Sequence, residues 1–271
     1  MHYQHRYHAG NFADVFKHVA LVGLLAALNR KESPWCYLET HAGTGLYDLT
    51  SITAERTGEF KDGIERLWGL KGAPEPLTRY LDWVRADNSN GQLRNYPGSP
   101  RLAQSFMREG DRLVLCEKVP AMAEQLKLNL RVAEIHRRDG YEAISLLPPK
   151  EKRGLVLVDP PFERPDEFEA CVEFLRAALA RFAQGVYAVW YPLKNAHVAD
   201  RFKRRCAALN RPLRVLEFDT GAPGEGQMRA CGLMVVNPPY RLAEDLESSM
   251  QVLVELLAQG PRAAYRSEGS E

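Results

Sequence analysis

The sequence has few cysteines, no long hydrophobic run and almost no net charge. Its five cysteines are isolated and form no Cys-x-x-Cys pair, which argues against a zinc cluster or a disulfide scaffold and is typical of a reducing compartment. No apolar stretch approaches the length of a membrane span, and no apolar run follows a basic N-terminus. We therefore expect a cytoplasmic protein that does not contact a membrane.

The formal net charge of +1 indicates that any contact with nucleic acid depends on local basic patches. The densest basic run is Arg-Phe-Lys-Arg-Arg at 201–205, and the charged stretch 46–96 is a second candidate. Five of the seven histidines lie within the first 41 residues, but no acidic or cysteine partners cluster with them at metal-ligand spacing. We therefore expect no metal site.

The most informative segment is an apolar run that ends in Asp159-Pro160-Pro161-Phe162. Residues 154–158 are Gly-Leu-Val-Leu-Val, which is typical of a strand buried on both faces. Because two prolines cannot continue a hydrogen-bonded ladder and they fix φ, we predict a rigid elbow at the carboxyl end of this strand. Ligands of open parallel sheets bind at that end. The elbow would offer a carboxylate, the Pro160 carbonyl and the Phe162 ring to a flat heteroaromatic amine.

Strand patterns alternate with helix patterns along most of the chain, which predicts a doubly wound, mostly parallel α/β sheet. Residues 46–96 interrupt this alternation, because they are polar and charged, with helical patches and no convincing strand. We interpret them as a small helical insertion, followed by a helix with Ser99 as its N-cap. Strands are expected near 35–40, 112–117, 133–140, 154–159, 186–191, 213–218 and 232–237, and helices near 9–30, 58–67, 77–84, 102–109, 121–131, 141–147, 166–182 and 194–208.

Acidic residues stand at the ends of several predicted strands. The first strand ends near Glu39, before the small-residue turn at 41–45, and later strands end at Glu117 and Asp139. In nucleotide-binding sheets, a glycine turn lets the backbone approach the ligand and an acid at the next strand end binds ribose hydroxyls. Taken singly, Glu117 or Asp139 is more typical of a helix N-cap or a surface acid. Their order, with Asp159 following, favours a cofactor site.

This order of glycine turn, acid, acid and Asp-Pro-Pro-aromatic resembles class I S-adenosylmethionine-dependent methyltransferases that act on exocyclic amino groups. Within that class, motifs from the N-terminus to about residue 240 resemble the RlmJ-type large-subunit ribosomal RNA adenine methyltransferases. The motifs that carry this resemblance are Tyr3, His5, His8-Ala9-Gly10-Asn11, Ala13-Asp14-Val15, Lys17-His18, Thr40-His41-Ala42-Gly43, Glu55-Arg56-Thr57-Gly58-Glu59 and Tyr96-Pro97-Gly98-Ser99-Pro100. Several of them lie outside the set shared by methyltransferases in general.

The resemblance implies a Rossmann-like methyltransferase domain at 1–45 and 97–260, and the family's helical insertion coincides with the insertion subdomain that composition predicts at 46–96. The small and charged residues at 261–271 predict a flexible tail. It implies that S-adenosylmethionine is the cofactor and that the 6-amino group of an adenine in 23S ribosomal RNA is methylated. We expect the RNA to be protein-free or in an early assembly intermediate, and the enzyme to be a monomer.

Residue roles follow from the positions that match the family's motifs. The cofactor would contact His18, His41, Ser99, Glu117, Asp139, Gly140 and Asp159. Asp159 would also be catalytic together with Pro160 and Phe162, and the RNA would contact Tyr3, His5 and Lys17. Phe162 stands where many relatives have tyrosine, so stacking on the target base is retained and any role of a phenolic hydroxyl is lost.

The sequence leaves two alternative functions open. An amino-methyltransferase acting on DNA or on a protein glutamine would present a planar nitrogen to the same elbow, although the chain has no separate domain for recognising a DNA sequence. A non-catalytic RNA-binding domain on the same fold would not need the Asp-Pro-Pro-aromatic elbow. A second such motif, Asn237-Pro238-Pro239-Tyr240, follows the last predicted strand. We favour Asp159 as the catalytic position, because it follows the acidic strand ends by one helix and one strand.

Overall fold

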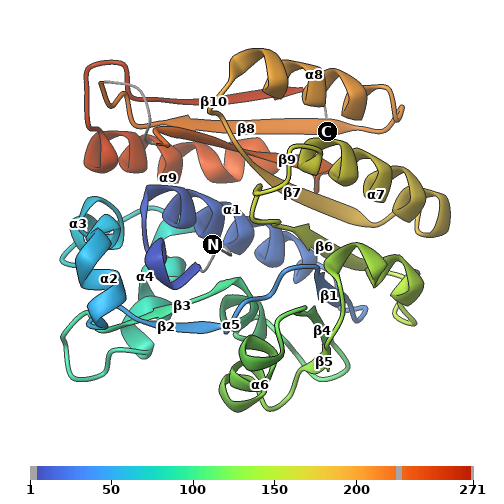
Figure 1. The fold of residues 1–271 in the computed structure, drawn as a ribbon, viewed down its shortest axis with the longest axis horizontal. Coiled ribbons are helices and arrows are strands. Elements are labelled where there is room, and N and C mark those ends of the chain that lie inside the picture. Colours follow the sequence, from blue (N-terminus) through green and yellow to red (C-terminus); the bar gives the residue numbers. More distant parts are fainter. Residues whose placement is uncertain (1–4, 224–227, 270–271) are drawn as a thin grey trace.

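The computed structural model describes residues 5–223 and 228–269 and contains an eight-stranded sheet of order β10-β8-β9-β7-β6-β1-β4-β5 (Figure 1). The strands are β1 (Cys36–Glu39), β4 (Arg112–Cys116), β5 (Glu134–His136), β6 (Gly154–Val158), β7 (Val186–Pro192), β8 (Leu213–Asp219), β9 (Ala230–Val236) and β10 (Ala264–Gly269). β5, β4, β1, β6 and β7 are parallel, whereas β9 is antiparallel to both of its neighbours. The predicted α/β fold with a mostly parallel sheet is therefore confirmed.

Helices cover both faces of the sheet (Figure 1). One core includes side chains of α1 (Phe12–Leu28), α5 (Ser99–Gln104), α6 (Pro120–Asn129) and α9 (Leu242–Leu257), and the other includes side chains of η3 (Gly140–Leu146), α7 (Glu167–Arg181) and α8 (Ala196–Ala207). Leu155 and Leu157 of β6 belong to the first core, and Val156 and Val158 belong to the second. Since successive side chains of a strand point to opposite faces, this uninterrupted apolar run is a central strand, as predicted.

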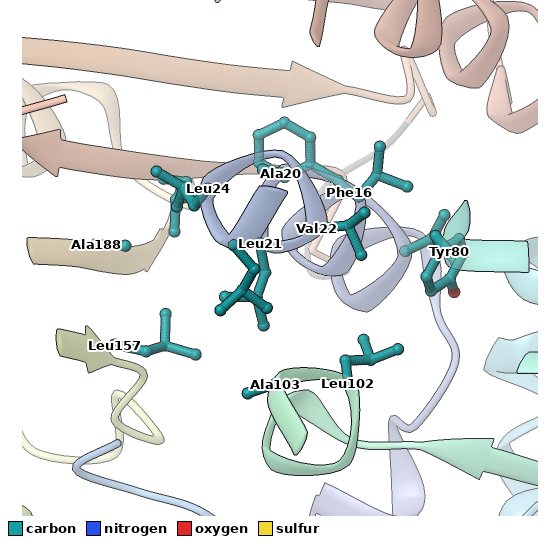
Figure 2. Close-up of a cluster of buried hydrophobic side chains, with 14 of the residues drawn as sticks. Phe16, Ala20, Leu21, Val22, Leu24, Tyr80, Leu102, Ala103, Leu157 and Ala188 are labelled. Atoms are coloured by element: carbon teal, nitrogen blue, oxygen red, sulfur yellow. The ribbon is translucent and has the colours of Figure 1, made fainter. Parts of the chain in front are cut away.

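α1 is buried around almost its whole circumference and lies at the centre of the first core. Figure 2 shows Leu157 and Ala188 of the sheet on one side of it, Leu102 of α5 below it and Tyr80 of α4 (Leu77–Ala86) on the far side. A helix that is apolar all round must be buried on all sides, so its few polar side chains are buried with it. Among the described residues, no helix combines the length and the apolar composition that crossing a membrane requires.

The segment 46–96 contains a strand pair that the sequence did not predict. Its further elements are β2 (Leu46–Asp48), α2 (Ile52–Thr57), η2 (Glu59–Asp62), α3 (Ile64–Leu67) and β3 (Asn95–Pro97). β2 pairs with β3 in antiparallel register, so the expectation of no strand here was wrong. Strands of three residues are too short to show the alternation from which strands are predicted. Ile64 and Tyr80 join the core around α1, and the division of 46–96 as a separate subdomain stays a prediction.

The C-terminal part differs from the prediction in two places. α9 lies where no element was expected, although Leu246, Met250 and Leu253 recur at helical spacing and are buried. The expectation of a flexible tail at 261–271 was wrong for 264–269, because β10 pairs with β8 along its whole length. Small and charged side chains are compatible with an edge strand, whose outer side faces solvent.

Candidate active site

The carboxyl ends of β1, β4 and β6 meet at one edge of the sheet. β1 pairs with β4 on one side and with β6 on the other, so the strand order reverses here. In doubly wound sheets, the crevice outside such a reversal is where ligands bind. Glu39 ends β1, Glu117 follows β4, Asp139 follows β5 and Asp159 follows β6. The sheet therefore brings together the acids that the sequence predicted to share a site.

The elbow after β6 holds Asp159 beside a buried lysine. The side chain of Asp159 is 15% exposed, and Lys17 Nζ donates to its Oδ2 at 2.6 Å. Phe162 has a φ of 50°, in the left-handed region that costs a residue with a Cβ about 1–2 kcal/mol. The centroid of its ring lies 4.8 Å from that of Phe168 and 5.8 Å from that of Trp190, and the residue remains partly exposed. The elbow thus presents one carboxylate and one packed aromatic ring at the sheet edge.

Lys17 lies on α1 between two carboxylates. Its Nζ is 2.9 Å from Asp14 Oδ1 and 2.6 Å from Asp159 Oδ2, and His5 Nε2 is 2.8 Å from Asp14 Oδ2. Burial alone would lower the pKa of Lys17, but the two carboxylates raise it well above its usual range. The structure therefore joins two residues predicted to contact RNA, His5 and Lys17, to the elbow. Tyr3 lies outside the described residues.

Glu117 connects the end of β4 to the glycine turn after β1. Its Oε2 accepts a hydrogen bond from Gly43 N at 3.0 Å, and its Oε1 accepts one from Val119 N at 2.8 Å. Burial raises the pKa of this carboxyl. Gly43 has a φ of 63°, and a Cβ there would overlap the Tyr47 hydroxyl, so only glycine fits the turn. The Glu117 carboxylate has about four acceptor positions, so it can also accept a hydrogen bond from a ligand hydroxyl.

Asp139 and Gly140 follow β5. Asp139 Oδ1 accepts a hydrogen bond from Tyr141 N at 3.1 Å, so this acid caps η3, and Lys118 Nζ donates to its Oδ2 at 2.9 Å. Burial would raise the pKa of Asp139, but these hydrogen bonds lower it below its usual range. A Cβ on Gly140 would overlap the carbonyl oxygen of Thr40, so this glycine allows η3 to approach the end of β1.

Two histidines of the predicted cofactor site are neutral, of which His18 is buried and His41 is partly exposed. Burial lowers the pKa of His18 to about 3 and that of His41 to about 4. His18 Nδ1 is hydrogen-bonded to the Tyr96 hydroxyl at 2.8 Å, and His41 Nδ1 to Thr40 Oγ1 at 2.8 Å. Within the described residues, the buried Nε2 of His18 has no hydrogen-bond partner. This atom could therefore accept or donate a hydrogen bond to a bound ligand.

Ser99 was predicted to cap a helix, but Gly98 is the N-cap of α5 and Ser99 is its first residue. Ser99 Oγ instead donates to Glu39 Oε1 at 2.6 Å, and the Tyr37 hydroxyl donates to Glu39 Oε2 at 2.7 Å. Burial raises the pKa of Glu39 to about 8, although both hydrogen bonds oppose this. The sequence marked Glu39 as a strand end without assigning it a role. An acid directly before a glycine turn is the signal that could have identified it.

The second proline elbow lies at the opposite edge of the sheet. β9 is antiparallel to β7, so Val236 at the end of β9 pairs with Tyr187 near the start of β7. Asn237, the next residue, therefore lies at the amino end of β7. Asn237 Nδ2 donates to the carbonyl oxygens of Ala183 and Gly185 at 2.9 and 2.8 Å. Asn237 therefore anchors the loop between α7 and β7 and is remote from the acids at the other edge.

The basic run at 201–205 is partly neutralised within the protein. Arg205 forms an ion pair with Glu169, and Lys203 Nζ lies 2.9 Å from Glu217 Oε1. Such contacts reduce the charge available for phosphates. Arg201 and Arg204 of this run are exposed.

Together, the strand order and the antiparallel β9 define the α/β fold of class I methyltransferases. The solved structure of a protein from Legionella pneumophila str. Philadelphia 1 superposes with a TM-score of 0.90 at 35% identity, over 97% of this chain and 99% of that one. A probable spermidine synthase from Corynebacterium glutamicum, with a TM-score of 0.51 at 11% identity over 98% of this chain and 78% of that one, shares the fold alone.

Sequence comparison identifies the family within that class. Residues 32–268 match the family described as "Ribosomal RNA large subunit methyltransferase D, RlmJ". "Ribosomal RNA large subunit methyltransferase J" of Escherichia coli (strain K12) is 37% identical over 255 residues, covering 91% of this chain and 90% of the relative. Its namesake in Haemophilus influenzae is 37% identical over 262 residues, covering 94% and 93%. The chain belongs to the RlmJ family of large-subunit ribosomal RNA methyltransferases, and the predicted family is confirmed.

Proposed function

We propose that this protein transfers a methyl group from S-adenosylmethionine to the 6-amino group of an adenine in 23S ribosomal RNA. The observation that carries the proposal is the position of Asp159, whose side chain is mostly buried at the strand-order reversal and whose Oδ2 accepts a hydrogen bond from Lys17. Membership of the family supports the methyl transfer and the class of RNA. The choice of adenine rests on the Asp-Pro-Pro-aromatic elbow.

The residues at the sheet edge fit S-adenosylmethionine. The Glu117 carboxylate suits ribose hydroxyls, and Asp139 next to Gly140 suits an adenine amino group. The Gly43 turn lets the backbone approach a ligand, and His18 Nε2 is a buried polar atom without a partner in the described residues. When bound, this cofactor supplies an electrophilic methyl group on a sulfonium centre. His41 and Ser99 are further contacts that we propose from the family's motifs.

Asp159 and Pro160 act on the target amine as hydrogen-bond acceptors. The lone pair of an adenine amino nitrogen is delocalised into the ring, and its proton is too weakly acidic for a carboxylate to remove beforehand. Acceptance of the two amino protons by the Asp159 carboxylate and the Pro160 carbonyl would pyramidalise the nitrogen and localise its lone pair. Positive charge grows on the nitrogen during the transfer, so fixed acceptors stabilise the transition state more than the ground state. The proton leaves afterwards to Asp159 or to water.

Phe162 positions the base. Its ring packs against Phe168 and Trp190, which fixes its plane, and a base stacked on it would gain about 1–3 kcal/mol. The target adenine must leave its own stack to enter the site. We propose that the protein acts in the cytoplasm, as a monomer, on RNA that is protein-free or in an early assembly intermediate, with His5, Lys17 and Tyr3 contacting that RNA.

A transfer assay with three acceptors tests this function. The purified protein is incubated with S-adenosylmethionine carrying a tritiated methyl group and with protein-free 23S RNA, DNA of the same sequence, or total cell protein. Label in the RNA, recovered as N6-methyladenosine after digestion, supports the proposal. Label in DNA or protein alone would instead identify another amino-methyltransferase. Cofactor binding by calorimetry without transfer to any acceptor would indicate a non-catalytic RNA-binding domain.

A further inference from the structure

Asp14 is a buried carboxylate in the first turn of α1 that none of the proposed steps uses. It is 3% exposed. Its Oδ2 accepts hydrogen bonds from Gly10 N at 3.0 Å and pairs with His5 Nε2 at 2.8 Å, while its Oδ1 lies 2.9 Å from Lys17 Nζ. One side chain therefore connects the N-terminal segment, the loop before α1 and the lysine that reaches the elbow.

The negative charge of Asp14 balances the buried ammonium of Lys17. Burial alone would raise its pKa, but His5 and Lys17 hold it well below the usual range, so Asp14 is ionised. Lys17 is equally buried, and an ammonium without counter-charges in such a place is strongly unfavourable. A lysine side chain has four rotatable carbons, so a single contact with Asp159 would not fix it. The contact with Asp14, one helical turn away, defines where the ammonium lies.

We propose that Asp14 is a positioning residue for methyl transfer, because it fixes the Lys17 ammonium on Oδ2 of Asp159 and leaves Oδ1 for the target amine. This inference rests on the proposed function. Among the described residues, no donor other than Lys17 is hydrogen-bonded to the Asp159 carboxylate. A carboxylate with one oxygen bound to a fixed cation cannot rotate freely, so its other oxygen keeps one direction. Orientation of this kind accounts for large factors in rate.

The test compares Asp14→Asn with Glu59→Gln. Asparagine has the shape of aspartate and keeps an acceptor oxygen for Gly10 N, but it loses the charge that holds Lys17. We expect kcat to fall about 10- to 100-fold, with the cofactor Kd changed less than about twofold and the KM for RNA changed less than kcat. Glu59 is the matched control, because it holds the same N-terminal segment through His8 and Asn11 and has no contact with Lys17. We expect Glu59→Gln to keep kcat within about threefold.

A double variant shows whether Asp14 acts through Lys17. In single-turnover assays with excess enzyme, Asp14→Asn should cause no further loss in a Lys17→Met background, because the group to be positioned is absent. The double variant removes the buried charges of Asp14 and Lys17 together, so it remains a test if Asp14→Asn alone does not fold.

Three results would overturn the inference. They are an unchanged kcat in Asp14→Asn, an equal loss in Glu59→Gln, and a further loss in the double variant. A wild-type protein that transfers no methyl group to 23S RNA would refute the proposed function instead, so the two failures are distinguishable.

Discussion

The variants Asn237→Ala and Asp159→Asn distinguish the two proline elbows. The first should lower the stability of the protein, and the second should lower the rate of methyl transfer. In Asn237→Ala, the carbonyl oxygens of Ala183 and Gly185 each lose a hydrogen bond from Nδ2, at a net cost of about 1 kcal/mol per bond. Asn237 also has a φ of 53°, and alanine tolerates this left-handed region less well than asparagine, by about 1 kcal/mol. The three costs together are about 3 kcal/mol, which in a chain of this size lowers Tm by roughly 6–12 °C.

The rate of methyl transfer should not fall with that loss of stability. Asn237 lies at the opposite edge of the sheet from Asp159, so kcat of Asn237→Ala, measured well below its Tm, should stay within about twofold of the wild type. Asp159→Asn puts an amide where the carboxylate accepts hydrogen bonds, and kcat should fall about 10²–10³-fold. Calorimetric Tm and single-turnover methyl transfer measure the two effects separately.

Two outcomes would refute the reasoning. A kcat loss in Asn237→Ala as deep as that in Asp159→Asn would mean that the catalytic elbow has been assigned wrongly. An unchanged Tm in Asn237→Ala would mean that its two hydrogen bonds contribute nothing to the fold.

Three further predictions follow from single features of the site. Glu117→Gln should weaken cofactor binding by about 10- to 100-fold, since a charged acceptor is lost, and an unchanged Kd in calorimetry would contradict the ribose contact. The pKa of Glu39 is raised to about 8 in the folded protein, so its contribution to stability is present below its ordinary pKa and is lost as pH rises to about 8. In urea unfolding, the wild type should therefore lose stability relative to Glu39→Gln between about pH 5 and 8, and a pH-independent difference would contradict this. Binding of 23S RNA should weaken with salt as counterions are released, and a flat salt profile would exclude phosphate contacts.

The sequence by itself determined the features that depend on neighbouring residues. The run 154–158 is apolar without interruption because it is buried on both faces, and the two prolines after it end the ladder wherever the strand lies. The strand ends at Glu117 and Asp159 could be predicted for the same reason, since each follows an apolar run, whereas the strand Glu134–His136 before Asp139 has a weaker pattern. The motifs that resemble the RlmJ family were sufficient to predict the family.

Only the tertiary structure decided which distant groups meet. Nothing in the local sequence places Lys17 beside Asp159 or Ser99 beside Glu39, because these contacts join α1 and α5 to strands far along the chain. The direction of β9 decided that Asn237 lies away from the site, and pairing with β8 decided that the charged C-terminal segment is a strand. Burial and ion pairing are properties of the packed chain, so ionisation at the site, as for Asp14 and Lys17, follows from the fold and not from the residue types.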